Sequence, residues 1–70
     1  MFGEGSGVVA EFDDKRGLGV VETAAGRRYP FHCSAIADGT RTIAAGTRVV
    51  FVIVAGRLGR QEATAIGPRP

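Results

Sequence analysis

The sequence predicts a small all-β domain, for three reasons. Glycine occurs 11 times in 70 residues and divides the chain into stretches too short for ordinary helices. Several of these stretches are rich in β-branched residues, which favour strands. Residues 48–54 are apolar almost throughout and form the strongest strand signal in the chain. Only one core is expected, because a chain this short buries only about 60% of its unfolded surface.

The first three expected strands form a meander. They span residues 7–13, 18–22 and 27–32. The turns between them lie at residues 13–17, a polar cluster ending in glycine, and at 23–26. Alternation along the third strand places Tyr29 and Phe31 together on one face, which we predict to be the core face. Pro30 cannot donate a hydrogen bond to a neighbouring strand, so this strand is expected at an edge of the sheet.

The second half of the chain contributes a long connector and a hairpin. Residues 33–45 lack a sustained period, apart from one short helical turn expected at 34–36. The remaining strands are expected at residues 48–54 and 60–66, joined by a turn at 55–59. Five short strands with a long connector after the third are typical of the five-stranded antiparallel OB-fold, a Greek-key barrel. An SH3-like barrel is the alternative. The domain is expected at residues 7–66, with a flexible leader at 1–6 and a flexible tail at 67–70.

Composition excludes several classes of protein. No apolar run approaches the roughly 18 residues that a membrane span needs, and the first residues lack the features of a secretory signal, so a cytoplasmic protein is expected. One cysteine and one histidine cannot form an internal disulfide or a four-ligand zinc site. We therefore expect no metal and no cofactor. The formal charge of +2 mildly favours an anionic partner, and residues 36–70 contain five basic and only two acidic side chains.

Two neighbouring segments carry the main functional signal. Residues 16–21 (RGLGVV) fit the skeleton of the RNP1 motif, with both of its aromatic residues replaced by aliphatic ones. Residues 29–36 (YPFHCSAI) follow in the next expected strand. Together these segments resemble the paired RNP1 and RNP2 strands of the bacterial cold-shock proteins. The resemblance extends over residues 7–66 and implies an OB-fold that binds nucleic acid.

In that family, single-stranded RNA or DNA lies across the first three strands, with bases stacked on exposed aromatic rings. Most of the matching positions here hold other residues, namely Glu11, Leu18, Val20, Pro30, Cys33 and Thr40. Phe12 and His32 retain rings. Arg16 matches the basic residue of RNP1, Arg41 a basic position of the family and Gln61 a base-contacting position, and Arg28 is added as a loop cation that could meet phosphates. With Arg28 included, nine residues are expected to bind nucleic acid: Phe12, Arg16, Leu18, Val20, Arg28, Pro30, His32, Arg41 and Gln61.

Loss of the rings predicts weak binding. Stacking of a base on an aromatic side chain is worth about 1–3 kcal/mol, so two unstacked bases remove roughly 2–6 kcal/mol. Glu11 also places a negative charge where a ring would meet the ligand. We expect binding with low sequence specificity that is weaker and more salt-sensitive than is usual in the family.

Two other interpretations of the same face remain open. Leu18, Val20, Pro30 and Phe12 could form an apolar patch that binds a protein, or the fold could persist with aliphatic residues that merely enlarge a small core. A monomer is expected, and a dimer through Leu18 and Val20 would hide the binding surface. We expect no enzymatic activity, because the adjacent side chains of His32 and Cys33 should point to opposite faces of a strand and form no nucleophile–base pair.

Overall fold

The structure, a computed structural model, describes residues 3–56 and 59–69. It confirms the all-β prediction. The strands are β1 (Gly3–Asp13), β2 (Leu18–Glu22), β3 (Arg28–His32), β4 (Arg48–Ala55) and β5 (Gln61–Pro68), and a 3-10 turn, η1 (Cys33–Ala35), follows β3. Among the described residues there is no helix with the length and apolar character that crossing a membrane requires.

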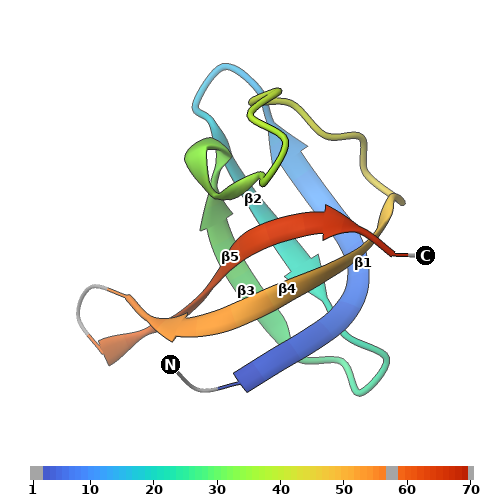
Figure 1. Cartoon of the computed structure of the whole chain (residues 1–70), viewed down its shortest axis with the longest axis vertical. Helices are drawn as coiled ribbons and strands as arrows, with labels where there is room; N and C mark the ends of the chain where they lie inside the picture. The colour runs from blue at the N-terminus through green and yellow to red at the C-terminus, as the bar shows by residue number, and fades with distance from the viewer. Residues whose placement is uncertain (1–2, 57–58, 70) are drawn as a thin grey trace.

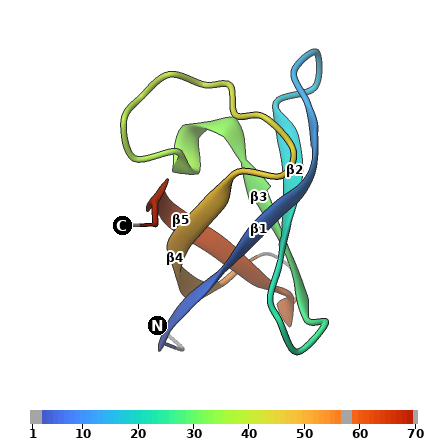
Figure 2. The same ribbon diagram turned by 90° about the vertical axis from the view of Figure 1, so that its right-hand side faces the viewer.

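All five strands belong to one antiparallel sheet in the order β3-β2-β1-β4-β5. Because β4 returns to lie beside β1, the first four strands form a Greek key, as an OB-fold requires. The sheet curls so that the β4–β5 hairpin crosses the β1–β2–β3 meander (Figures 1 and 2). Its edge strands, β3 and β5, share no ladder in the described part of the chain, although an isolated bridge joins Ile36 to Ile66. The predicted edge position of β3 is confirmed.

Strand β1 is longer than the sequence predicts. Its first half, Gly3–Val8, pairs with β4, and its second half, Val8–Asp13, pairs with β2. Residues 3–6, expected in a flexible leader, are thus part of the sheet, and Gly67 and Pro68, expected in the tail, belong to β5. No apolar pattern marks residues 3–6 as a strand, because this Gly-Ser-rich segment is held by backbone pairing with a distant strand, which needs no apolar side chains. Residues 1, 2 and 70 of the expected leader and tail lie outside the described residues.

The core lies between the hairpin and the meander. Tyr29 and Phe31 are 7% and 3% exposed, which confirms their predicted core positions. The buried hydrophobic residues are Val9, Val21, Tyr29, Phe31, Ile36, Val49, Phe51, Ala63 and Ile66. Every strand contributes to this set. The β4–β5 hairpin and the β1–β2–β3 meander are therefore stabilised by one shared core.

A bulge in β1 decides which of its side chains face outward. Val9 pairs with Val21 and Glu11 with Val20, so Ala10 is an extra residue in β1. Side chains normally alternate between faces, and a bulge shifts this alternation by one residue. As a result Val9 is buried whereas Glu11 is exposed beside the outward face of β2.

Candidate nucleic-acid interface

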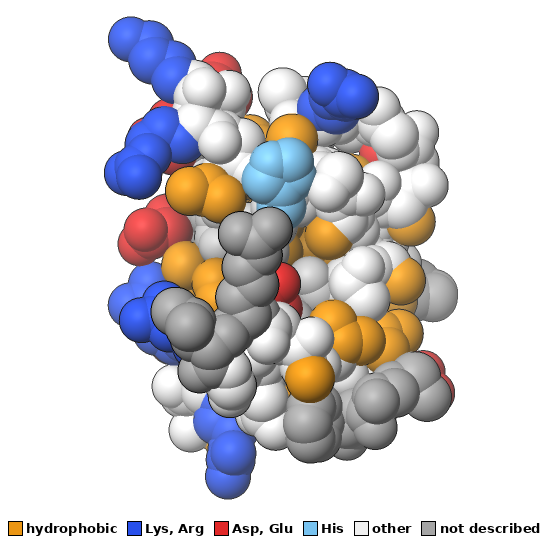
Figure 3. Space-filling model, turned by 90° about the vertical axis from the view of Figure 1, so that its left-hand side faces the viewer, with side chains coloured by type: hydrophobic (Ala, Val, Ile, Leu, Met, Phe, Trp, Pro, Cys, Tyr) orange, Lys and Arg blue, Asp and Glu red, His pale blue; other side chains and the backbone are white. Residues whose placement is uncertain are grey.

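The outward face of β2 and β3 carries four of the predicted site residues. Leu18 pairs with His32 and Val20 with Pro30 across the two strands, so the four side chains form a compact patch, hereafter the platform. Leu18 and His32 are exposed, and Val20 and Pro30 are half-buried. In the space-filling view, hydrophobic side chains lie around the pale-blue histidine, the chain's single one, and charged side chains of both signs line the neighbouring edge (Figure 3).

His32 is held in a defined orientation at the end of β3. It is the N-cap of η1, and its Nδ1 accepts a hydrogen bond from the Ser34 N–H at 3.1 Å. The Ser34 hydroxyl lies 2.8 Å from the same nitrogen. The neutral ring therefore carries its proton on Nε2, which leaves an N–H donor for a ligand.

Cys33 lies closer to His32 than alternation along a strand predicts. Its Sγ is 3.8 Å from His32 Nδ1, because β3 ends at His32 and η1 begins at Cys33. The expectation that the two side chains point to opposite faces is wrong. The thiol is half-buried, however, and Nδ1 already accepts the Ser34 N–H, so this nitrogen is occupied by a structural hydrogen bond.

Phe12 does not lie on the platform. It is half-buried against the core, and its ring stacks on that of Phe31, with centroids 5.9 Å apart and planes 12° from parallel. It pairs with Gly19 while its neighbour Glu11 pairs with Val20, so the two adjacent side chains point to opposite faces of β1. The expectation that Phe12 offers a ring to a base is therefore corrected, and His32 has the one aromatic ring among the platform residues.

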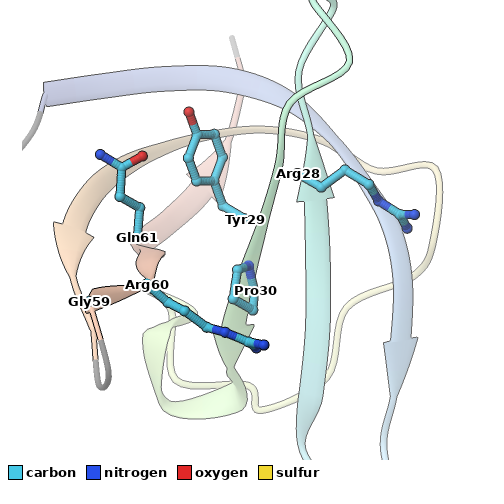
Figure 4. A pocket seen from close by; sticks show the side chains of 6 residues that line it. All are labelled: Arg28, Tyr29, Pro30, Gly59, Arg60 and Gln61. Carbon is cyan, nitrogen blue, oxygen red and sulfur yellow. The ribbon is translucent and has the colours of Figure 1, made fainter.

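Arg28 is engaged with two carboxylates. Its Nη2 lies 3.2 Å from Glu11 Oε2, and its Nε lies 3.5 Å from Glu22 Oε1. Glu22 faces Arg28 directly across β2 and β3, whereas Glu11 is reached by a side chain that extends over β2 (Figure 4). This charge cluster of Arg28, Glu11 and Glu22 carries one positive and two negative charges. Arg28 was predicted to meet phosphates, but here its charge is already neutralised within the protein.

Arg16 is placed near the platform by the turn between β1 and β2. The carboxylate of Asp13 accepts hydrogen bonds from the N–H groups of Lys15 and Arg16 at 3.1 and 3.3 Å, which fixes this turn. A shallow hollow of about 300 Å³ lies between this turn and the platform. Its lining includes the predicted residues Arg16, Leu18, Val20 and Pro30 together with Glu11 and Asp13. The structure therefore brings these four predicted residues together, but with two carboxylates among them.

A second and larger hollow opens on the other side of Pro30, toward β5. This edge pocket of about 660 Å³ is lined by Arg28, Tyr29, Pro30, Gly59, Arg60 and Gln61. Tyr29 and Gln61 point the same way, Arg60 extends from the start of β5 toward Pro30, and Arg28 points away from the other labelled side chains (Figure 4). The pocket unites Pro30 with the predicted residue Gln61 and adds Arg60, which the sequence analysis missed.

A family model decides how this arrangement is interpreted. The 'cold-shock' DNA-binding domain matches residues 5–68. The chain belongs to the cold-shock domain family. This match confirms the predicted resemblance, and a cold-shock domain is a nucleic-acid-binding domain that binds single strands. No curated protein is significantly similar to the chain in sequence.

Within this cold-shock domain the last predicted residue, Arg41, stands apart from the platform. It lies in the exposed connector between η1 and β4, has a φ of 65° and lines neither of the two hollows described above. The preceding turn is held by Asp38, whose carboxylate accepts hydrogen bonds from the N–H and hydroxyl of Thr40 at 3.0 and 2.8 Å. These hydrogen bonds lower the pKa of the Asp38 carboxyl.

Proposed function

We propose that this cold-shock domain binds single-stranded RNA or DNA with low sequence specificity, and more weakly than members of the family that keep an aromatic platform. The observation that carries the proposal is the platform itself. Three of its four side chains, Leu18, Val20 and Pro30, are aliphatic, and only His32 has an aromatic ring. Aliphatic surface packs against any base with little discrimination and without the stacking energy of a ring.

Electrostatics support the same conclusion. Glu11, Asp13 and Glu22 lie beside the platform and reduce the attraction of its cations for phosphates. Short-range attraction to a few arginines is screened by salt, with a Debye length of about 8 Å at physiological ionic strength. Affinity should therefore be low, and the part of it that rests on charge should be lost as salt is added.

We further propose that the domain acts in the cytoplasm as a monomer without catalytic activity.

The test is an amide NMR titration of the ¹⁵N-labelled protein with a short pyrimidine-rich single strand at low salt. Shifts should concentrate on the platform and the 14–17 turn and should disappear as salt is added. A log-log slope near −0.7 per neutralised phosphate is expected. Absence of shifts at millimolar strand would refute the proposal and favour a protein partner for the aliphatic face, whose binding would respond little to salt.

A further inference from the structure

We infer that Arg60 supplies a phosphate contact of this domain, so that a bound strand passes over the edge pocket between β3 and the start of β5. The inference rests on the proposed binding of single strands. It adds Arg60, which the sequence motifs did not indicate, to Gln61, which the family resemblance already implies as a base contact at the start of β5.

The charge cluster makes the β1 side of the platform unfavourable for a polyanion. Arg28 is shared by Glu11 at 3.2 Å and Glu22 at 3.5 Å, and all three side chains remain accessible to solvent. The excess negative charge of the cluster therefore faces the ligand. A phosphate approaching Arg28 would have to displace a carboxylate or accept two carboxylates as neighbours, and like charges at short distance repel.

Arg60 has no such competitor among residues 3–56 and 59–69. Within the described residues both ion pairs belong to Arg28, so no carboxylate there neutralises the guanidinium of Arg60. The residue is exposed, and its side chain reaches from the β5 side toward Pro30 of β3 (Figure 4). A guanidinium presents a planar set of N–H donors that matches a phosphate.

The other walls of the edge pocket suit the rest of a nucleotide. Pro30 provides a rigid apolar surface that also borders the platform, so a base could pass from one to the other. Gln61 adds an amide, which can donate and accept hydrogen bonds. The pocket therefore combines a cation for the backbone, an apolar wall and a polar group, all of which lie outside the charge cluster.

The experiment compares variants in binding a fluorescent eight-nucleotide oligo-deoxythymidine, measured by anisotropy at several salt concentrations. Arg60→Ala should weaken binding about tenfold, the effect of losing one charge-assisted contact. It should also make the salt slope shallower by about 0.7, corresponding to one phosphate. Arg60→Lys should keep the slope because it keeps the charge.

The matched control is Arg69→Ala, which removes the same charge from an exposed residue that lines a different hollow with Ser6 and Arg48. It should change affinity less than Arg60→Ala at every salt concentration. Equal effects of the two substitutions, with the wild type binding, would overturn the role of Arg60 and leave the proposed function intact. A wild type that does not bind would refute the proposed function and this inference together.

Discussion

The rings of Phe12 and Phe31 stack on each other across Gly19, which pairs with both residues from the strand between them. A Cβ on Gly19 would lie 2.5 Å from Cζ of Phe31, so only glycine leaves room for this ring. The contact joins β1 to β3 on the inner side of the sheet. Phe12, which the sequence predicted to bind nucleic acid, therefore stabilises the fold.

Phe12→Ala should reduce stability without reducing the affinity of the folded protein. Full truncation of a buried Phe costs about 3–5 kcal/mol, and a half-buried one should cost about 1–3 kcal/mol. Urea denaturation followed by circular dichroism measures the loss. Strand affinity, measured where the variant is folded, should be unchanged, and a large decrease there would place the Phe12 ring in the binding site after all.

Restoring rings to the platform should strengthen binding. Leu18→Phe and Val20→Phe each offer a stacking surface worth about 1–3 kcal/mol, or roughly 5- to 150-fold in affinity. Anisotropy with the oligo-deoxythymidine measures the gain. Val50→Phe is the matched control, because Val50 is similarly exposed but belongs to β4. If all three variants bind alike, the platform is not the surface that meets the bases.

Glu11→Gln should raise affinity at low salt. The change removes a negative charge beside the platform and releases Arg28 from one of its two carboxylates. A single charge at about 4 Å in water is worth about 1 kcal/mol, which corresponds to about a fivefold gain that disappears at high salt. Glu4→Gln, at the opposite end of β1, is the control and should have little effect. A gain that persists at high salt would contradict the electrostatic explanation.

His32 should show a single neutral tautomer with its proton on Nε2. The reason is the hydrogen bond that Nδ1 accepts from the Ser34 N–H. Long-range ¹H–¹⁵N spectra of the neutral ring distinguish the two nitrogens. A proton on Nδ1 would show that the cap of η1 does not form in solution.

The connector turn should respond to acid through Asp38. Its folded pKa lies below the ordinary value because the carboxylate accepts the Thr40 hydrogen bonds. The stabilisation of the turn is therefore complete above the unfolded pKa and is lost as the pH falls through the lowered folded value. An NMR titration should give Asp38 a lower midpoint than an aspartate in a short peptide, and the Thr40 amide should shift with the same midpoint. An unresponsive Thr40 amide would contradict the hydrogen bond.

Local sequence patterns predicted those features that depend on neighbouring residues. The bounds of β2, the core positions of Tyr29 and Phe31 and the edge position of β3 all follow from alternation, glycine turns and the missing N–H of Pro30. These features require no knowledge of the partner strand.

Features that depend on distant pairing were missed. The start of β1 has no apolar pattern and is defined by β4, and the pairing of Arg28 with Glu11 spans 17 residues. The edge pocket exists because the curled sheet brings β3 beside the start of β5, which no local pattern indicates. The basic surplus of residues 36–70 was the available signal for Arg60, but it did not distinguish this residue from the other arginines.

The division of β1 between two partner strands has a consequence for how the protein unfolds. One continuous strand pairs with β4 through its first half and with β2 through its second, and only Val8 pairs in both. Separating the hairpin from the meander removes half of the hydrogen bonds of β1 and exposes the shared core on both sides. The domain should therefore lose its structure in one cooperative step, with slowly exchanging amides in both halves of β1 reporting the same opening free energy.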